Sequence, residues 1–338
     1  MMNSSGDFGD VAILGAGGMG TAMAVLFARS ARSVRLWARD PDRAIAIQST
    51  RRNALHLPEA ILPPNVSIIS SKAHAIDGAD LIVAAIPTKF LRSTLEGLSL
   101  ETLGEIPVLS VVKGIELGTF ARPSEILQQT LGDRPVAVLS GPSHAEEIAR
   151  GLPASVVVAS TDESLNERVQ ASLNSRQLRI YTNSDMMGVE LAGAMKNILG
   201  VAAGICDGLN FGDNAKAALL TRGLVEIARF SCEMGARPST FLGLAGVGDL
   251  ITTCYSPFGR NRAVGFKIGQ GATLSEALAG MKDIAEGVTT AKSVHLLSLK
   301  RGITMPITDE VHAILYEDKP PRAAVTDLML RLPKVEWP

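Results

Sequence analysis

The sequence contains only three cysteines among its 338 residues, Cys206, Cys232 and Cys254, and it has no Cys-x-x-Cys pair. An odd number of cysteines in dissimilar contexts indicates neither a disulfide framework nor a zinc knuckle. No metal site is predicted, and a reducing compartment fits best.

The sequence also lacks an excess of charge and an uninterrupted apolar run. Its 33 Lys and Arg balance 34 Asp and Glu, giving a formal net charge of −1, which argues against a nucleic-acid or anionic-lipid partner and favours a small-molecule one. The most apolar stretch, Gly188 to Ile205, contains Glu190, Lys196 and Asn197, so no membrane span is predicted. The first ten residues carry no basic cluster and no long apolar region, unlike a secretory signal. These absences predict a soluble cytoplasmic protein.

What the sequence does contain is a change of pattern near its middle. Short apolar or β-branched runs alternate with helical patterns up to about residue 182, which predicts a parallel sheet covered by helices. The expected strands are Val11–Gly15, Ser33–Trp37, Val66–Ile69, Asp80–Ile86, Ile106–Val112, Val136–Ser140, Ala154–Ser160 and Gln177–Thr182. Beyond them the sequence predicts only helices, with breaks at 212–213, 235–238, 257–259 and 306.

A chain of this length favours two domains over one. We therefore expect a frayed tail over residues 1–10, a dinucleotide-binding domain over 11–184 and a helical substrate domain over 185–338.

A glycine-rich segment follows the first expected strand and opens the first expected helix. It reads Gly15-Ala16-Gly17-Gly18-Met19-Gly20. Gly15 permits the tight turn, Gly17 lets a pyrophosphate approach the backbone, and Gly20 allows close packing of helix on strand. A glycine-rich turn without a ligand is the alternative. The flanking strand and helix favour the dinucleotide, and so predict an α/β, Rossmann-type, doubly wound parallel sheet followed by an all-α C-terminal domain.

Arg39, directly after the second expected strand, bears on the choice between nicotinamide dinucleotides. A guanidinium there can pair with a 2′-phosphate, so NADP(H) is preferred. The neighbouring Asp40 keeps NAD(H) as an alternative, because a carboxylate can accept bonds from a ribose 2′-hydroxyl. Arg39 as a solvated loop charge is the other interpretation.

Two lysines are candidates for chemistry. Lys113 follows the fifth expected strand, at the sheet edge where open α/β folds bind ligands, although an exposed loop lysine has the same sequence signature. Lys196 interrupts an apolar helix between Gly193 and Gly200, where small neighbours let a ligand come close. Burial lowers a lysine pKa toward values useful for proton transfer. The alternative for Lys196 is a side chain that extends to the surface.

Two later segments carry polar groups among glycines. Asp249 lies in Gly246-Val247-Gly248-Asp249-Leu250 and could hold the Lys196 ammonium, whereas Gly259-Arg260-Asn261 could clamp an anion. Helix-terminal salt bridges explain both segments equally well.

Together these residues resemble the bacterial-type NAD(P)-dependent glycerol-3-phosphate dehydrogenases from about Val11 to Tyr316. The resemblance rests on an ordered series of segments: 15–22, 139–147, 188–191, 195–197, 207–208, 214–215, 221–224, 243–246, 248–250, 260–261 and 286–287.

This resemblance implies reduction of dihydroxyacetone phosphate to sn-glycerol 3-phosphate for phospholipid synthesis, with Lys196 as the general acid/base. It implies that Lys113 contacts substrate and nicotinamide and that Asp249 aligns Lys196. A homodimer is also expected on this basis alone. The positions that match substrate contacts are Gly141, Ser143, Gly259, Arg260 and Asn261, and those that match cofactor contacts are Gly15, Gly17, Gly18, Met19, Gly20, Ala145, Arg260, Ile284 and Glu286. Gly18-Met19 and Gly259 depart from the residues common in the family, which have Ser or Asn before an aromatic and Ser before Arg-Asn.

Two other hypotheses remain at this stage. A β-hydroxyacid dehydrogenase would share the architecture and a helix-borne lysine, and a guanidinium binds a carboxylate as well as a phosphate. A redox-sensing regulator would bind NAD(P)H without turnover and would not need Lys113, Lys196 and Asp249.

Overall fold

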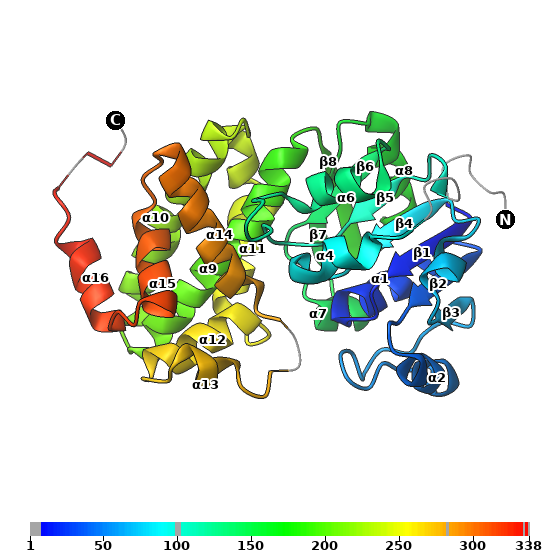
Figure 1. Ribbon diagram of the computed structural model, residues 1–338, viewed down its shortest axis with the longest axis horizontal. Coiled ribbons are helices and arrows are strands. Elements are labelled where there is room, and N and C mark those ends of the chain that lie inside the picture. The colour runs from blue at the N-terminus through cyan, green and yellow to red at the C-terminus, as the bar shows by residue number, and fades with distance from the viewer. Residues whose placement is uncertain (1–7, 99–102, 282–283, 334, 337–338) are drawn as a thin grey trace.

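The computed structural model describes residues 8–98, 103–281, 284–333 and 335–336. Figure 1 shows two parts side by side, a strand-containing part built from the first half of the chain and a helical part built from the second.

Each expected strand is present in the described structure. The strands are β1 (Asp10–Leu14), β2 (Ser33–Trp37), β3 (Val66–Ile69), β4 (Leu81–Ala84), β5 (Val108–Ser110), β6 (Val136–Ser140), β7 (Ala154–Ala159) and β8 (Leu178–Asn183). They form one eight-stranded sheet in the order β3-β2-β1-β4-β5-β6-β7-β8. The order reverses between β1 and β4, and this switch point is where open sheets of this type bind ligands.

One pairing differs from the expected parallel sheet. β6 and β7 run antiparallel, whereas the other neighbouring strands pair in parallel. The helix between them, α7 (Ala145–Ala149), has five residues and is therefore only about 7.5 Å long. It is too short to carry the chain back along the sheet. β7 therefore starts at the edge of the sheet where β6 ends and runs antiparallel to it.

Helices cover both faces of the sheet. They are α1 (Gly18–Phe27), α2 (Pro41–Thr50), α3 (Lys72–Ile76), α4 (Thr88–Leu95), α6 (Pro123–Leu131), α7 and α8 (Glu163–Leu173). Alternate side chains of β1 point to opposite faces: Val11 and Ile13 join the core under α1 and α8, and Ala12 and Leu14 join the core under α3, α4 and α6. The doubly wound α/β class predicted from sequence is confirmed.

The second half of the described chain is helical, as predicted. It contains α9 (Met186–Gly208), α10 (Gly212–Glu233), a 3₁₀ turn (Pro238–Leu242), a π-helical turn (Leu244–Gly248), α11 (Asp249–Tyr255), α12 (Arg260–Gly269), α13 (Leu274–Leu278), α14 (Glu286–Arg301), α15 (Pro306–Tyr316) and α16 (Pro321–Met329). The Asp185 carboxylate starts α9 by accepting a hydrogen bond from the Gly188 amide, 2.9 Å away.

α9 is the central helix of this part. Among the described residues it is the one helix long and apolar enough to cross a membrane, and all of its apolar window is buried inside the molecule. Glycines let α12 pack directly on it: a Cβ on Gly204 would lie 2.0 Å from the Arg262 carbonyl oxygen, and one on Gly265 would lie 1.9 Å from that of Val201. This close packing fixes the start of α12 beside the middle of α9.

The beginning of the chain departs from the expected frayed tail. Residues 1–7 lie outside the described residues, but Phe8 is buried beneath the guanidinium of Arg168, and Asp10 pairs with Ser33 in the sheet. The ordered fold therefore starts before residue 11, because Phe8 contributes an aromatic ring to the core.

Candidate active site

The glycine-rich loop joins β1 to α1 at the switch point of the sheet. Gly15 has φ +116°, and a Cβ there would lie 2.6 Å from the Ala85 carbonyl oxygen at the end of β4. A Cβ on Gly20 would lie 1.8 Å from the Gly15 carbonyl oxygen. Packing inside the chain therefore requires glycine at both positions.

Unlike Gly15 and Gly20, Gly17 is not required by packing inside the chain. A Cβ there would meet no atom of the described structure within 4 Å, so internal packing does not account for the residue. Gly17 is the N-cap of α1, the helix has no side-chain cap, and its first turn has no acidic residue. The exposed amides and the helix dipole suit a pyrophosphate, so these residues fit a dinucleotide.

Two residues that sequence analysis did not single out hold this loop in place. The Ala16 carbonyl oxygen accepts hydrogen bonds from the Arg43 guanidinium and the Asn53 amide, each at 2.9 Å. Asn53 is buried and also donates to Thr21 Oγ1 at 2.8 Å. Both residues come from segments after β2, so no local motif around the glycines could reveal them.

Arg39 is exposed just beyond the end of β2, where the sequence analysis expected a 2′-phosphate contact. The Asp40 carboxylate caps α2 by accepting hydrogen bonds from the amides of Asp42 and Arg43. One Asp40 oxygen thus accepts hydrogen bonds from the backbone, while Arg39 is exposed to solvent.

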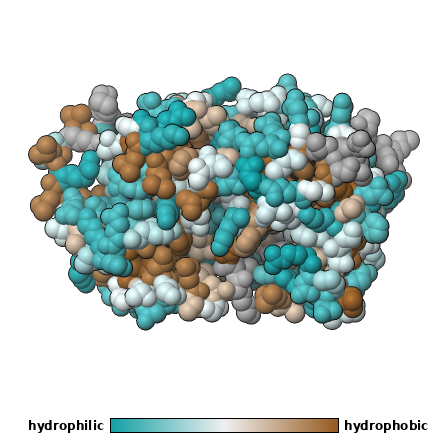
Figure 2. Space-filling model, viewed as in Figure 1, coloured by the Kyte–Doolittle hydropathy of each residue, from teal (hydrophilic) through white to brown (hydrophobic). Residues whose placement is uncertain are grey.

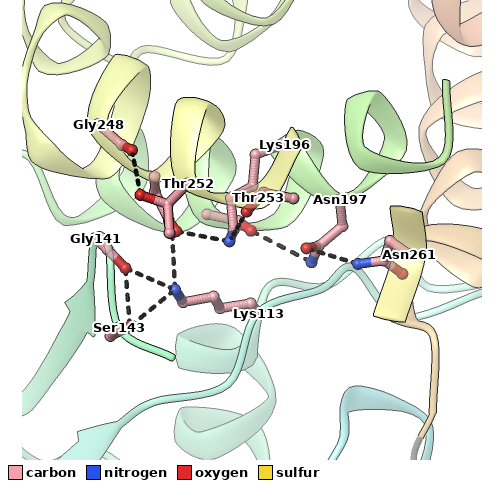
Figure 3. Close-up of polar contacts among 11 residues, drawn as sticks. Lys113, Gly141, Ser143, Lys196, Asn197, Gly248, Thr252, Thr253 and Asn261 are labelled. Carbon is pink, nitrogen blue, oxygen red and sulfur yellow. Dashed lines mark hydrogen bonds and ion pairs between the residues drawn. The ribbon is translucent and has the colours of Figure 1, made fainter. Parts of the chain in front are cut away.

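Two lysines meet at one carboxylate at the junction of the two parts. Lys113 Nζ lies 2.8 Å from Asp249 Oδ2, and Lys196 Nζ lies 2.7 Å from Asp249 Oδ1. Figure 3 shows the two lysines approaching from opposite sides, Lys113 from the loop after β5 and Lys196 from α9. The three residues that the resemblance assigned to catalysis are therefore adjacent, although 136 positions separate Lys113 from Asp249 in the chain.

The electrostatics of this cluster follow from its burial. Burial lowers the pKa of Lys196 to about 8, because desolvation and repulsion by Lys113 outweigh attraction by Asp249. Burial by itself would raise the pKa of Asp249, but the two adjacent ammonium groups hold it below its ordinary value. Asp249 thus stays ionised while Lys196 can release and regain a proton near neutral pH.

The surroundings of Lys196 rule out the interpretation that its side chain extends to the surface. Lys196 is buried, and its ammonium also donates to Thr253 Oγ1 at 2.5 Å. A Cβ on Gly193 would lie 2.6 Å from Ser140 Oγ, and one on Gly200 would lie 2.9 Å from the Thr253 methyl group. These glycines bring neighbouring elements close to the lysine. Thr253 was missed in the sequence, where nothing distinguishes it from an ordinary helix residue.

Gly141 and Ser143 lie on the nucleotide-domain side of the cluster. Lys113 Nζ is 3.2 Å from the Gly141 carbonyl oxygen and 3.4 Å from Ser143 Oγ, and the Ser143 hydroxyl donates to the same carbonyl at 2.8 Å (Figure 3). Gly141 has φ +120°, a conformation that favours glycine. This turn therefore orients Lys113 toward Asp249.

Asn261 lies buried at the start of α12 and links three elements. Its amide nitrogen donates to Asn197 Oδ1 at 2.9 Å, next to Lys196 on α9. Its oxygen accepts a hydrogen bond from the Gly287 amide at 2.9 Å. The second hydrogen of the Asn261 amide has no acceptor among the described residues and can be donated to a ligand.

Gly259 and Arg260 precede Asn261. A Cβ on Gly259 would lie 3.0 Å from the Thr253 carbonyl oxygen, so the serine common in the family would crowd this turn. Arg260 is exposed at the first position of α12, and its charge opposes the rise of the Glu286 pKa.

The remaining cofactor candidates border the same region. Glu286 begins α14 and accepts a hydrogen bond from the Thr88 amide at 3.0 Å, across the two parts of the molecule. Burial raises the Glu286 pKa to about 7. Met19 and Ile284 are half-buried, and Ala145 is buried at the start of α7.

Gly18 is not required by packing. A Cβ on Gly18 would lie 3.6 Å from the Ala145 Cβ, which is an ordinary contact, so the structure could hold the Ser or Asn that is common in the family at this position.

A dinucleotide-binding sheet, a helical second part and a buried lysine–carboxylate pair between them define a nicotinamide-dependent oxidoreductase. The comparison with known families is more specific. The model described as NAD-dependent glycerol-3-phosphate dehydrogenase N-terminus matches residues 10–166, and the corresponding C-terminus model matches residues 185–326. The chain belongs to this family.

Individual relatives agree with that assignment. The chain is 47% identical to glycerol-3-phosphate dehydrogenase [NAD(P)+] of Prosthecochloris aestuarii, covering 96% of this chain and 99% of the relative. It is 44% identical to the Chlorobium phaeobacteroides BS1 protein of the same name, covering 96% and 98%. The crystal structure of glycerol-3-phosphate dehydrogenase from Coxiella burnetii matches with a TM-score of 0.91 at 36% identity, covering 96% of this chain and 99% of that one.

Proposed function

We propose that this protein reduces dihydroxyacetone phosphate to sn-glycerol 3-phosphate, reversibly, with Lys196 as the general acid/base. Membership of the family and relatives named glycerol-3-phosphate dehydrogenase [NAD(P)+] support the reaction. The observation that carries the mechanism is the buried contact of Lys196 with Asp249 at the junction of the two parts.

The residues have complementary tasks in this proposal. A bound nicotinamide dinucleotide supplies or accepts the hydride. The Lys196 ammonium donates a proton to the oxygen on C2 during reduction and accepts the hydroxyl proton during oxidation. Asp249 holds the amine in position, and Lys113 neutralises the carboxylate and contacts the substrate.

The phosphate of the substrate is assigned to the start of α12. Arg260 offers a guanidinium that can bind it through two hydrogen bonds, and Asn261 offers the amide hydrogen not given to Asn197. Ser143 and Gly141 complete the pocket on the opposite side. Binding energy from this remote group orients C2 for reaction.

The cofactor is NADP(H) by preference, with NAD(H) as an alternative. Gly15 to Gly20 are assigned to the pyrophosphate, Arg39 to the 2′-phosphate, and Ala145, Arg260, Ile284 and Glu286 to the rest of the dinucleotide. The NAD(P)+ in the names of the relatives agrees with use of either cofactor.

The proposal also covers the domain division, the cellular compartment and the oligomeric state of the protein. The chain divides between residues 184 and 185 into a dinucleotide-binding domain, which includes Phe8 and Asp10, and a substrate domain; the change from β8 to α9 around Asp185 supports this division. We expect a cytoplasmic homodimer that acts in phospholipid precursor synthesis and binds no nucleic acid.

One assay tests the function against its alternatives. NADPH oxidation is followed with dihydroxyacetone phosphate, with 3-oxo acids and with no substrate. We expect rapid oxidation with dihydroxyacetone phosphate only. Faster oxidation with 3-oxo acids would support a β-hydroxyacid dehydrogenase, and NADPH binding without turnover would support a redox sensor.

A further inference from the structure

Two of the five histidines of the chain meet between α14 and α15. The rings of His295 on α14 and His312 on α15 are stacked, with their centroids 3.9 Å apart. Glu317, directly after α15, brings a carboxylate to the same place. One nitrogen of each ring and one Glu317 oxygen all lie within 4.8 Å of one another. The fold thus gathers three side chains that can each bind a metal ion.

His312 has a ring nitrogen that the protein itself does not satisfy. Only 8% of the residue is exposed, and its Nδ1 forms no hydrogen bond within the part of the chain that the structure describes. Glu317 Oε1 lies 3.2 Å from this nitrogen, without the geometry of a hydrogen bond. Two ligands on one tetrahedral zinc ion also lie about 3.3 Å apart, because each is about 2.0–2.1 Å from the metal. A buried polar atom without a partner is costly, and a bound metal ion would satisfy it.

His295 is oriented by a second carboxylate. Its Nδ1 lies 2.8 Å from Asp309 Oδ1. A neutral imidazole carries one N–H, and when Nδ1 donates it to Asp309, Nε2 keeps the lone pair that binds a metal ion. Carboxylates hold metal-binding histidines in this way. The two ring planes are inclined by only 15°, so one ring has to turn for both lone pairs to converge, and the histidine torsion next to the ring is soft.

Charge and access at this cluster suit a cation. The side chains of Asp309 and Glu317 are 40% and 60% exposed, so an ion can enter from water. Figure 2 shows hydrophilic side chains where Figure 1 has α15. Lys292, a cation beside His312, has its ammonium over the Tyr316 ring at 5.0 Å, which leaves two carboxylates against one ammonium. Imidazole with carboxylate suits Zn²⁺ and related ions, whereas Mg²⁺ and Ca²⁺ prefer oxygen ligands.

We propose that His295, His312 and Glu317 bind one divalent transition-metal ion of the zinc class, with water as the fourth ligand and Asp309 orienting His295. The sequence analysis predicted no metal site because it considered the cysteines, and no spacing relates two histidines on separate helices. The ion joins α14 to the end of α15 and stabilises the folded chain, because the unfolded chain does not hold these groups together. The site uses none of the residues assigned to substrate or cofactor.

Calorimetric titration with ZnCl₂, after treatment with EDTA and its removal, tests the proposal. We expect saturable binding of one Zn²⁺ per chain and a rise in Tm that EDTA reverses. Asp309→Asn should weaken binding about 10–100-fold, the usual effect of losing a carboxylate that orients a ligand. Loss of a ligand in His295→Gln, His312→Gln or Glu317→Ala should weaken it at least as strongly. The matched control is His74→Gln, at an exposed histidine on α3, and it should bind like the parent.

Circular dichroism establishes that each variant is folded. Glu317 is exposed, so Glu317→Ala keeps the test decisive even if His312→Gln does not fold. A parent protein that binds no Zn²⁺, or that binds several ions without saturation, would overturn the proposal. Zn²⁺ affinity that is unchanged in Glu317→Ala and Asp309→Asn would also overturn it. Each of these results leaves the assignment of dihydroxyacetone phosphate reduction untouched, because that reaction is tested by a separate assay.

Discussion

At the scale of single residues, the chemistry depends on where each charge lies. Lys196 and Asp249 are buried and contact each other, so their pKa values shift in ways that serve proton transfer. Arg39 and Arg260 are exposed, so each can bind a ligand group at little cost of desolvation.

Arg39→Ala should weaken NADP(H) far more than NAD(H), because only NADP(H) has the 2′-phosphate. A charge-assisted hydrogen bond contributes about 1.5–3 kcal/mol, so the preference should fall roughly ten- to a hundredfold. Fluorescence titration with both cofactors measures this. Arg176→Ala, at an exposed arginine just before β8, is the control and should change neither affinity. Equal losses for NADP(H) and NAD(H) would remove Arg39 from phosphate recognition.

Arg260→Gln should lower kcat/KM for dihydroxyacetone phosphate while leaving the poor rate with unphosphorylated dihydroxyacetone almost unchanged. The guanidinium acts on the phosphate, and the second substrate has none. Both rates are measured at saturating cofactor. If both substrates lose the same factor, Arg260 supports the fold or the nucleotide, and Ser143 and Asn261 become the candidates for the phosphate.

At the scale of helices and strands, the position of each residue is set by close packing. α12 lies against α9 because glycines remove the Cβ atoms between them, and this contact places Asn261 within hydrogen-bond reach of Asn197. The geometry of the site is therefore built into the contact between these two helices.

Gly204→Ala tests that contact. The added Cβ would meet the Arg262 carbonyl oxygen, so the free energy of unfolding should fall by about 1–3 kcal/mol despite the better helix propensity of Ala. Displacement of α12 should also raise KM for dihydroxyacetone phosphate. Chemical denaturation and steady-state kinetics measure the two effects. Ala217→Gly, at an exposed position of α10, reports the helix-propensity effect and should leave KM unchanged. A Gly204→Ala protein as stable as the parent would contradict the packing argument.

The sequence was sufficient to predict elements whose signals are local. Runs such as Val136–Ser140 alternate with helical spacing, and the glycine fingerprint lies between β1 and α1 as expected. The antiparallel β7 was missed because the expected strands did not show that α7 has only five residues and is too short to carry the chain back along the sheet. Arg43, Asn53 and Thr253 were missed because their partners lie far along the chain and no spacing records such contacts.

At the scale of the whole molecule, the site exists only where the two parts meet. Lys113 comes from the loop after β5, Asp249 begins α11, and Glu286 of α14 accepts a hydrogen bond from Thr88 at the start of α4. The electrostatics of Lys196 therefore depend on a charge supplied by the other part of the chain.

The pH profile of the reaction should show this effect of the Lys113 charge on Lys196. Dihydroxyacetone phosphate reduction needs protonated Lys196, so kcat/KM should fall as pH rises through the Lys196 pKa of about 8. Lys113 lowers that pKa by repulsion, so Lys113→Met should move the midpoint to higher pH. The midpoint is informative even if the variant is slower. A midpoint that stays fixed or moves to lower pH would contradict the coupling.

The most direct measurement of the central claim compares turnover and cofactor binding in Lys196→Ala. Dihydroxyacetone phosphate reduction is assayed at saturating substrates, and NADPH affinity is titrated on the same preparation. The account predicts a folded protein that binds NADPH like the parent and loses turnover by at least ~10²–10⁴, the usual contribution of a general acid/base. Turnover within a few-fold of the parent would contradict the account and exclude Lys196 as the proton donor.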